Sequence, residues 1–270
     1  MYLQGFETRE VTDIPVRALV KSAGGILHKK EATVAPYEIT SWPKFSLTDG
    51  PICVFGILRG TGTLIAKCIS LKQNFYYFDH AYLFGNRHEN SSFYGDKIYR
   101  LTKNWFHIRE VQTLNQEERK RIANYKNKIK LKSWKKSGEY ILVCPPSNFI
   151  VRYFNLHNWL DNTVNVLEKN SDRKIKIRGK DSINSLESDI DNSWAVVTSQ
   201  SSIAIDALIR GKPSFCDKIS MALPLSLTDF AKIEQPIYPD TREQFIETLL
   251  ANQFTLKEIE NGTAWEKVSK

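Results

Sequence analysis

A polar turn between a strand and a helix is the part of the sequence best suited to chemistry. Residues 194–213 read WAVVTSQSSIAIDALIRGKP. A buried strand leads into a turn of small polar residues, namely Thr198, Ser199, Gln200, Ser201 and Ser202. A helix start offers unpaired N–H groups and a positive dipole end, which together suit nucleotide phosphates. Asp206, one turn further on, could accept hydrogen bonds from ribose hydroxyls. Ser201 or Ser202 simply capping the helix explains the same pattern.

Two further strands end in residues that could hold a diphosphate. The run YILVCPPS ends at Ser147, and the run KIKIRGK ends in Arg178 and Lys180. Ligands of parallel sheets bind at the carboxyl ends of the strands, so these ends are candidate donor contacts. Arginine offers a planar fork and lysine a point charge. A helix cap at Ser147 and two merely exposed cations are the alternatives.

A candidate acid–base pair follows a strand in the first half of the chain. The strand 74–79 ends in Asp79 and His80. Moving a group onto a hydroxyl needs a base for its proton, and aspartate or histidine can serve. We expect Asp79 to be this base, with His80 second; Asp79 could instead orient His80, or cap a turn beside a packed histidine. Nearby residues form a candidate acceptor surface: Tyr82, Arg87, Arg100 and Lys103.

Other chemical patterns are weaker. Arg59 stands in a turn, RGTG, that lacks the full G-x-G-x-x-G spacing, so its glycines could serve only a sharp bend. Arg59 is still a candidate for donor phosphate. Asp189 and Asp191 form a D-x-D before a strand rather than after one, so we interpret them as solvated surface. The four cysteines have no metal-ligand spacing and are expected to be reduced, mostly buried thiols. We predict no metal.

The elements that must position these residues alternate between strand and helix, which predicts an α/β fold with mainly parallel sheets. The expected strands are 52–58, 75–79, 140–144, 174–178, 195–198 and 213–216. The expected helices are 61–72, 149–169, 202–210 and 242–251. We predict an acceptor-side domain over residues 1–130 and a nucleotide-sugar-binding domain over 131–270.

Charge is unevenly distributed along the 270 residues. The net charge is +8, and residues 119–136 contain nine Lys or Arg and no acid. This segment could meet DNA phosphates or be a solvated helix and linker. We find no apolar run long enough to span a bilayer and no secretory signal. We therefore expect a cytoplasmic protein, in the host cytoplasm if it is phage-encoded.

A family resemblance sharpens these expectations. The string VVTSQSSIAIDALIRGKPSF resembles the C-terminal motif of GT-B-type glycosyltransferases and is closest to the capsule-type pattern, with Asp206 where Glu is usual. The segment QFTLKEIENGTAWEKV is similar to an uncharacterised bacterial and phage family, and the likeness covers residues 50–268. It implies a compact GT-B-like protein of two Rossmann-like domains facing a cleft. It also implies a nucleotide-sugar co-substrate, a UDP-sugar by expectation, and no cofactor.

Several functions fit that resemblance. The acceptor could be a hydroxymethylated base in phage DNA, such as 5-hydroxymethylcytosine, which the basic segment favours. A duplex acceptor would need its base flipped out. It could instead be a surface or capsule-type glycan. A non-catalytic nucleic-acid-binding α/β protein is a second class, and a nucleotide-sugar epimerase is a weaker third.

Overall fold

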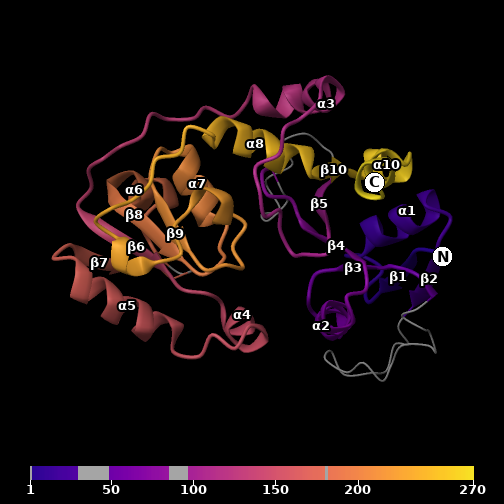
Figure 1. Ribbon diagram of the computed structural model, residues 1–270, viewed down its shortest axis with the longest axis horizontal. Coiled ribbons are helices and arrows are strands. Elements are labelled where there is room, and N and C mark those ends of the chain that lie inside the picture. Colours follow the sequence, from indigo (N-terminus) through magenta and orange to yellow (C-terminus); the bar gives the residue numbers. More distant parts are fainter. Residues whose placement is uncertain (1, 30–48, 85–96, 180–181) are drawn as a thin grey trace. The chain divides into compact units, whose positions relative to one another are not determined.

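The chain folds into two compact units. The computed structural model describes residues 2–29, 49–84, 97–179 and 182–270. Unit 1 comprises residues 1–106 and 252–270, and unit 2 comprises residues 107–251 (Figure 1). The predicted boundary near residue 130 therefore differs from the division in the structure. The chain end returns to unit 1 because β10 (Gln253–Thr255) pairs antiparallel with β5 (Ile98–Lys103).

Unit 1 is built on a six-stranded sheet with the order β10-β5-β4-β3-β1-β2. Its remaining strands are β1 (Gln4–Glu7), β2 (Ile26–Lys29), β3 (Ile52–Phe55) and β4 (Phe75–His80). Strands β1 to β4 are parallel, and β5 runs antiparallel to β4. Because β1 leads to β2 on one side and lies beside β3 on the other, the connections reverse direction between β1 and β3.

Helices cover both faces of this sheet (Figure 1). On one face lie α1 (Ile14–Ser22), α9 (Leu256–Glu260) and α10 (Thr263–Val268), and α2 (Thr61–Leu71) lies on the other. The first face buries Leu19, Phe78 and Phe254 completely. Gly5 lets α1 approach β1, because a Cβ there would lie 2.3 Å from Val20 Cγ2. Close packing of α1 thus explains a glycine inside a strand.

Unit 2 is built on a four-stranded parallel sheet with the order β7-β6-β8-β9. These strands are β6 (Tyr140–Cys144), β7 (Lys174–Ile177), β8 (Ser193–Thr198) and β9 (Ser214–Cys216). One face packs Val143, Val197 and Phe215 against residues of α5 (Trp159–Asn170). The other packs Val196 against α6 (Leu186–Asn192) and α7 (Ile203–Ile209). Burial on both faces explains the continuous apolar runs of β6 and β8.

The remaining helices of unit 2 are α3 (Gln116–Lys126), α4 (Asn148–Tyr153) and α8 (Arg242–Ala251). Lys126 of α3 forms ion pairs with Glu243 and Glu247 of α8. The single helix expected over 149–169 is wrong, because α4 and α5 are separate. Asn155 and Asn158 between them have left-handed backbone φ angles of 53° and 61°, which asparagine tolerates.

The expectations about the cysteines and about membrane-spanning segments can be compared with the structure. All four cysteines are free and buried, as predicted. Within the described ranges, no helix combines the length and apolar character needed to cross a membrane.

Candidate functional site

The carboxyl edge of the unit 2 sheet collects most of the predicted donor-binding residues. Strand pairing aligns Cys144 with Thr198, and Thr198 with Cys216. Arg178 follows β7, and its N–H donates to Val143 O at 2.8 Å. The connections of this sheet reverse between β6 and β8. Such a switch point is where open α/β sheets bind ligands, so the residues after β6 and β8 lie at the expected place.

Ser147 and Thr198 border that switch point in different ways. Ser147 is partly exposed and is the N-cap residue of α4, but its side chain makes no capping hydrogen bond. Thr198 is fully buried, and its hydroxyl donates to Cys144 O at 2.8 Å. Thr198 therefore ties β8 to β6 across the switch point. Its hydroxyl bonds within the sheet, whereas Ser147 is partly exposed and makes no capping bond.

The turn after β8 is short and its helix is brief. Helix α7 has seven residues. Ser201 Oγ accepts from Ile203 N at 3.4 Å, and Ser202 is the N-cap residue without a side-chain cap. Gln200, Ser201 and Ser202 are partly exposed, and Asp206 lies partly exposed in the first turn. The structure thus places the predicted turn at the sheet edge.

Ser199 and Asp217 form a polar pair at the same edge. Asp217 N donates to Ser199 O at 3.0 Å, and Asp217 Oδ2 accepts from Trp159 Nε1 at 2.8 Å. Burial raises the pKa of the Asp217 carboxyl, and the nearby Ser199 and Trp159 side chains reduce that rise. Ser199 Oγ is buried and makes no hydrogen bond within the part of the chain that the structure describes. Asp217 was missed in the sequence, although applying the strand-end rule to 213–216 would have found it.

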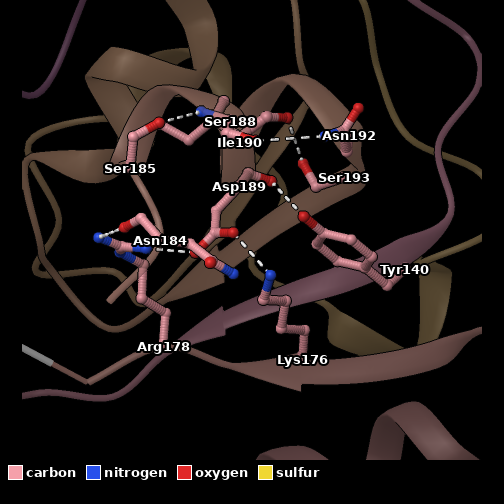
Figure 2. Close-up of polar contacts among 10 residues, drawn as sticks. All are labelled: Tyr140, Lys176, Arg178, Asn184, Ser185, Ser188, Asp189, Ile190, Asn192 and Ser193. Carbon is pink, nitrogen blue, oxygen red and sulfur yellow. Dashed lines mark hydrogen bonds and ion pairs between the residues drawn. The ribbon is translucent and has the colours of Figure 1, made fainter. Parts of the chain in front are cut away.

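Arg178 is held by an internal carboxylate (Figure 2). Its guanidinium forms an ion pair with Asp189 and donates to Asn184 O at 3.0 Å. Lys176 Nζ binds the other oxygen of Asp189 at 2.6 Å. Two cations and one anion leave a net positive charge beside the sheet edge. Lys180, the other predicted cation, lies outside the described residues.

The interpretation of Asp189 and Asp191 as solvated surface is wrong. The side chain of Asp189 is only 2% exposed, and burial disfavours its carboxylate. Hydrogen bonds from Lys176 and Arg178 outweigh burial and lower its pKa. Asp191 forms ion pairs with Arg210 and Lys132, and mainly the Arg210 hydrogen bond lowers its pKa to about 2. The local sequence does not show this, because the cations that pair with these carboxylates come from other segments of unit 2.

In unit 1, Asp79 and His80 lie at the carboxyl end of β4, as expected. Asp79 Oδ2 lies 2.5 Å from Arg100 Nη2 and accepts from the Tyr77 hydroxyl at 2.9 Å. Burial disfavours the Asp79 carboxylate, but the Arg100 guanidinium outweighs it, and the pKa of Asp79 is lowered. Asp79 Oδ1 accepts from the backbone N–H of His80 at 2.7 Å. Asp79 therefore fixes the backbone at His80.

His80 borders a pocket at this edge of the sheet. The pocket has a volume of about 150 Å³ and is lined by Val11, Thr12, Phe55, His80, Lys97, Ile98 and Tyr99. His80 is exposed, and its ring meets that of Phe55 edge to face at 5.7 Å. The pocket lining comes from the loop after β1, the ends of β3 and β4, and the start of β5. These residues were not in the predicted acceptor surface, because the pairing of β5 with β4 is a long-range contact.

The predicted acceptor residues are dispersed. Arg100 is buried under the Tyr77 and Tyr82 rings, with its guanidinium carbon 5.8 and 5.3 Å from their centres. Lys103 pairs with Tyr76 near the start of β4, whereas Tyr99 pairs with His80. Four residues of strand separate Tyr99 and Lys103 by about 13 Å, so Lys103 lies away from the pocket edge. Arg87 is outside the described residues.

Arg59 stands in the loop after β3 with a left-handed backbone φ of 60°. The Thr61 hydroxyl is close to Gly56 O and Leu58 O, at 2.9 and 2.6 Å. This contact closes the glycine-rich turn on itself. Arg59 is partly exposed at the carboxyl edge of unit 1.

Several cations of the basic segment, residues 119–136, make contacts inside unit 2. Lys126 pairs with α8, the Arg121 guanidinium donates to Ala251 O at 2.6 Å, and Lys132 pairs with Asp191 at 2.9 Å. Lys136 Nζ lies 5.2 Å from the centre of the Tyr238 ring. Several of its cations thus hold the unit together rather than form a free cationic surface.

Comparisons with known proteins bear on the fold. No protein-family model matches the chain, and no curated protein matches its sequence. Among solved structures, it is similar to the beta Kdo 2,7 transferase KpsC of Thermosulfurimonas dismutans, with a TM-score of 0.56 and 10% identity. That match covers 99% of this chain and 100% of the other. A UDP-GlcNAc 2-epimerase of Methanocaldococcus jannaschii, solved with UDP-GlcNAc and UDP, matches over 99% and 98% of the two chains. Its TM-score of 0.30 at 10% identity supports no argument.

The KpsC likeness shows the fold. The chain is a mixed α/β protein of two Rossmann-like domains with the GT-B-type architecture, as predicted.

Proposed function

We propose that the chain is a glycosyltransferase that moves a sugar from a nucleotide-sugar donor to a hydroxyl of a carbohydrate acceptor. The observation that carries this proposal is the switch point of unit 2, where Ser147, Arg178 and the Ser199–Ser202 turn follow neighbouring parallel strands. The GT-B-type fold supports it, because the similar structure carries the name of a Kdo transferase.

In this proposal, the donor binds to unit 2. The hydroxyls of Ser147, Ser201 and Ser202 are suited to donate hydrogen bonds to the diphosphate, and Gln200 adds an amide. The Lys176–Arg178–Asp189 cluster supplies net positive charge for the leaving group. Lys180 remains a proposed phosphate contact. Fixed cations and donors stabilise charge developing on a leaving diphosphate without a metal.

The proposed base is His80. The Asp79 carboxylate is paired with Arg100, and its lowered pKa makes it a weak proton acceptor. His80 is exposed beside the unit 1 pocket, and a positioned imidazole can take the proton of an acceptor hydroxyl. Asp79 would then position His80 through its backbone N–H.

The acceptor is placed in the unit 1 pocket. Its Phe55 and Tyr99 side chains offer apolar ring surface, and Thr12 and Lys97 offer polar groups. Aromatic surface beside a few polar groups suits a sugar ring. A carbohydrate acceptor is favoured over modified DNA because Arg121, Lys126 and Lys132 of the basic segment are engaged inside unit 2.

A transfer assay tests the proposal. The protein is incubated with UDP-, GDP- and CMP-sugars, each with a pool of bacterial-type oligosaccharides or with hydroxymethylcytosine-containing DNA. We expect nucleotide release and an added sugar mass on an oligosaccharide for one donor class. A new glycosylated nucleoside after DNA digestion would instead assign the DNA acceptor. Absence of product and of nucleotide binding with every donor would overturn the proposal.

Variants of His80 separate chemistry from donor binding. We expect His80→Gln to lower kcat by about 10²–10⁴-fold, the usual contribution of a general base, while nucleotide affinity stays the same. The matched control is His157→Gln, which changes a histidine in unit 2. Equal loss of activity in both variants would contradict the role of His80.

A further inference from the structure

Asp217 occupies the sheet edge of unit 2 without a role in the donor site predicted above. It follows β9 directly, and β9 aligns Cys216 with Thr198 of the neighbouring strand. Its backbone is fixed on both sides, since Asp217 N donates to Ser199 O at 3.0 Å and Asp217 O accepts from Ser220 N at 2.9 Å. The carboxyl group therefore stands beside the serine turn in a defined position.

The partners of this carboxyl group are neutral. Trp159 Nε1 donates to Asp217 Oδ2 at 2.8 Å. Trp159 begins α5 and is itself buried against the sheet, so this contact orients the carboxyl group. Among the described residues, Asp217 forms no ion pair, unlike Asp79, Asp189 and Asp191. Burial without a cation raises the pKa of Asp217.

A second observation points to a polar ligand at the same place. The Ser199 side chain is fully buried, and its hydroxyl has no hydrogen-bond partner among the described residues. Buried polar groups are nearly always satisfied, and an exception needs a bound molecule or another explanation. Asp217 and Ser199 thus provide an acceptor and a donor, side by side, with hydrogen-bonding capacity left over.

We propose that Asp217, oriented by Trp159 and assisted by Ser199, binds a vicinal pair of hydroxyls on the donor nucleotide-sugar. The proposal rests on the proposed function. An ionised carboxylate accepts hydrogen bonds from two adjacent hydroxyls at once, and charge-assisted bonds of this kind are strong. Asp206 was the carboxylate first predicted for this task, but it lies in the first turn of α7, beyond the polar turn that follows β8. Asp217 lies at the strand end itself.

Two parts of the donor carry vicinal hydroxyls, namely the ribose of the nucleotide and the transferred sugar. Both have the same chemistry, so the experiment separates them. Wild type, Asp217→Asn and Asp206→Asn are titrated calorimetrically with UDP, GDP and CMP, with the 2′,3′-dideoxy form of the best nucleotide, and with its nucleotide-sugars. Asparagine keeps the shape of the side chain and an oxygen for Trp159. Asp161→Asn, an exposed position on α5, is the matched control.

We expect Asp217→Asn to weaken binding about tenfold or more, with Asp206→Asn and Asp161→Asn close to wild type. If the ribose is bound, the loss occurs with the free nucleotide and disappears with the dideoxy form. If the transferred sugar is bound, the loss occurs only with the nucleotide-sugar. Trp159→Phe, which removes the ring N–H, should give a smaller loss in the same direction.

Two failures are distinguishable. Wild type that binds no nucleotide or nucleotide-sugar would overturn the proposed function, and this inference with it. Wild type that binds, with Asp217→Asn within twofold of it on every probe, would overturn the role of Asp217 alone. Thermal unfolding of each variant checks the fold, and Asp217→Asn is expected to melt no lower than wild type.

Discussion

Asp79 in unit 1 and Asp217 in unit 2 stand at corresponding places, each at the carboxyl end of a parallel strand. Asp79 meets a cation, because Arg100 lies 2.5 Å away on the antiparallel strand β5. Among the described residues, the Asp217 carboxyl meets no cation: it accepts a hydrogen bond from Trp159, and the neutral Ser199 side chain lies nearby. Burial disfavours both carboxylates, yet the pKa of Asp79 is lowered and that of Asp217 is raised. The charge of the neighbour, rather than the position on the sheet, separates a structural carboxylate from one available to a ligand.

The largest expected effect comes from removing the cation beside Asp79. The Arg100 side chain is 4% exposed and lies under two tyrosine rings. We expect Arg100→Met to lower the free energy of unfolding by about 4 kcal/mol, because it leaves Asp79 partly buried and unpaired. Urea unfolding measures this loss, and Arg100→Lys should recover part of it. A loss below about 1 kcal/mol would show that the pair is not structural.

Within unit 2, Asp189 is a second carboxylate that is paired with cations, in contrast to Asp217. Its side chain is only 2% exposed, but it binds Lys176 and Arg178 (Figure 2). We expect Asp189→Asn to lower the free energy of unfolding by about 3 kcal/mol, since two cations lose their shared partner. Urea unfolding beside the exposed control Asp161→Asn checks this. Equal stability of the two variants would contradict the structural role of Asp189.

At Asp217 we expect the same kind of substitution to raise the free energy of unfolding rather than lower it. Because burial raises its pKa in the folded protein, the carboxylate costs stability, and the cost grows as pH rises through the raised value. We therefore expect Asp217→Asn to stabilise the free protein by on the order of 1 kcal/mol at pH 7. The difference should vanish near and below about pH 4, the ordinary aspartate value. Thermal unfolding from pH 3 to pH 8 measures it, and a destabilised variant at pH 7 would refute this explanation.

The smallest effect is expected at Asp191, whose ion pairs are partly exposed. Arg210 and Lys132 lower its pKa to about 2, so its contribution is present above the ordinary aspartate pKa and is lost between about pH 4 and pH 2. We expect Asp191→Asn to cost about 0.5 kcal/mol at pH 7 and less in high salt, as exposed pairs do. Chemical unfolding at low and high ionic strength tests this, and a salt-independent loss would contradict it.

Much of the fold follows from the sequence where elements are buried and continuous. The bounds of β6 and α8 are those predicted, and the strand before the serine turn is found because it is apolar along its length. Strands β1 and β2 were not predicted, since each has four residues, β1 contains Gly5, and β2 is largely exposed. The return of the chain end to unit 1 depends on the β10–β5 pairing, which no local pattern shows.

The candidate site divides in the same way. Positions at strand ends, such as Ser147, Ser199 and His80, could be predicted because parallel strands bring their ends to one edge. The partners of each side chain could not be predicted. The pairing of Asp79 with Arg100, and of Asp189 with Arg178, depends on partners from other strands. Asp217 was missed although its strand was predicted, because its neighbours Ser199 and Trp159 are distant in sequence.

We propose above all that the carboxyl edge of unit 2 holds the donor. Hydrogen exchange with bound nucleotide is the sharpest test of this. Backbone amide exchange is compared with and without the best of UDP, GDP and CMP at saturation. We expect slower exchange at residues 145–148, 199–206 and 217–220, with unit 1 unchanged. Protection confined to the glycine-rich turn at residues 56–62, or to no part of unit 2, would contradict it.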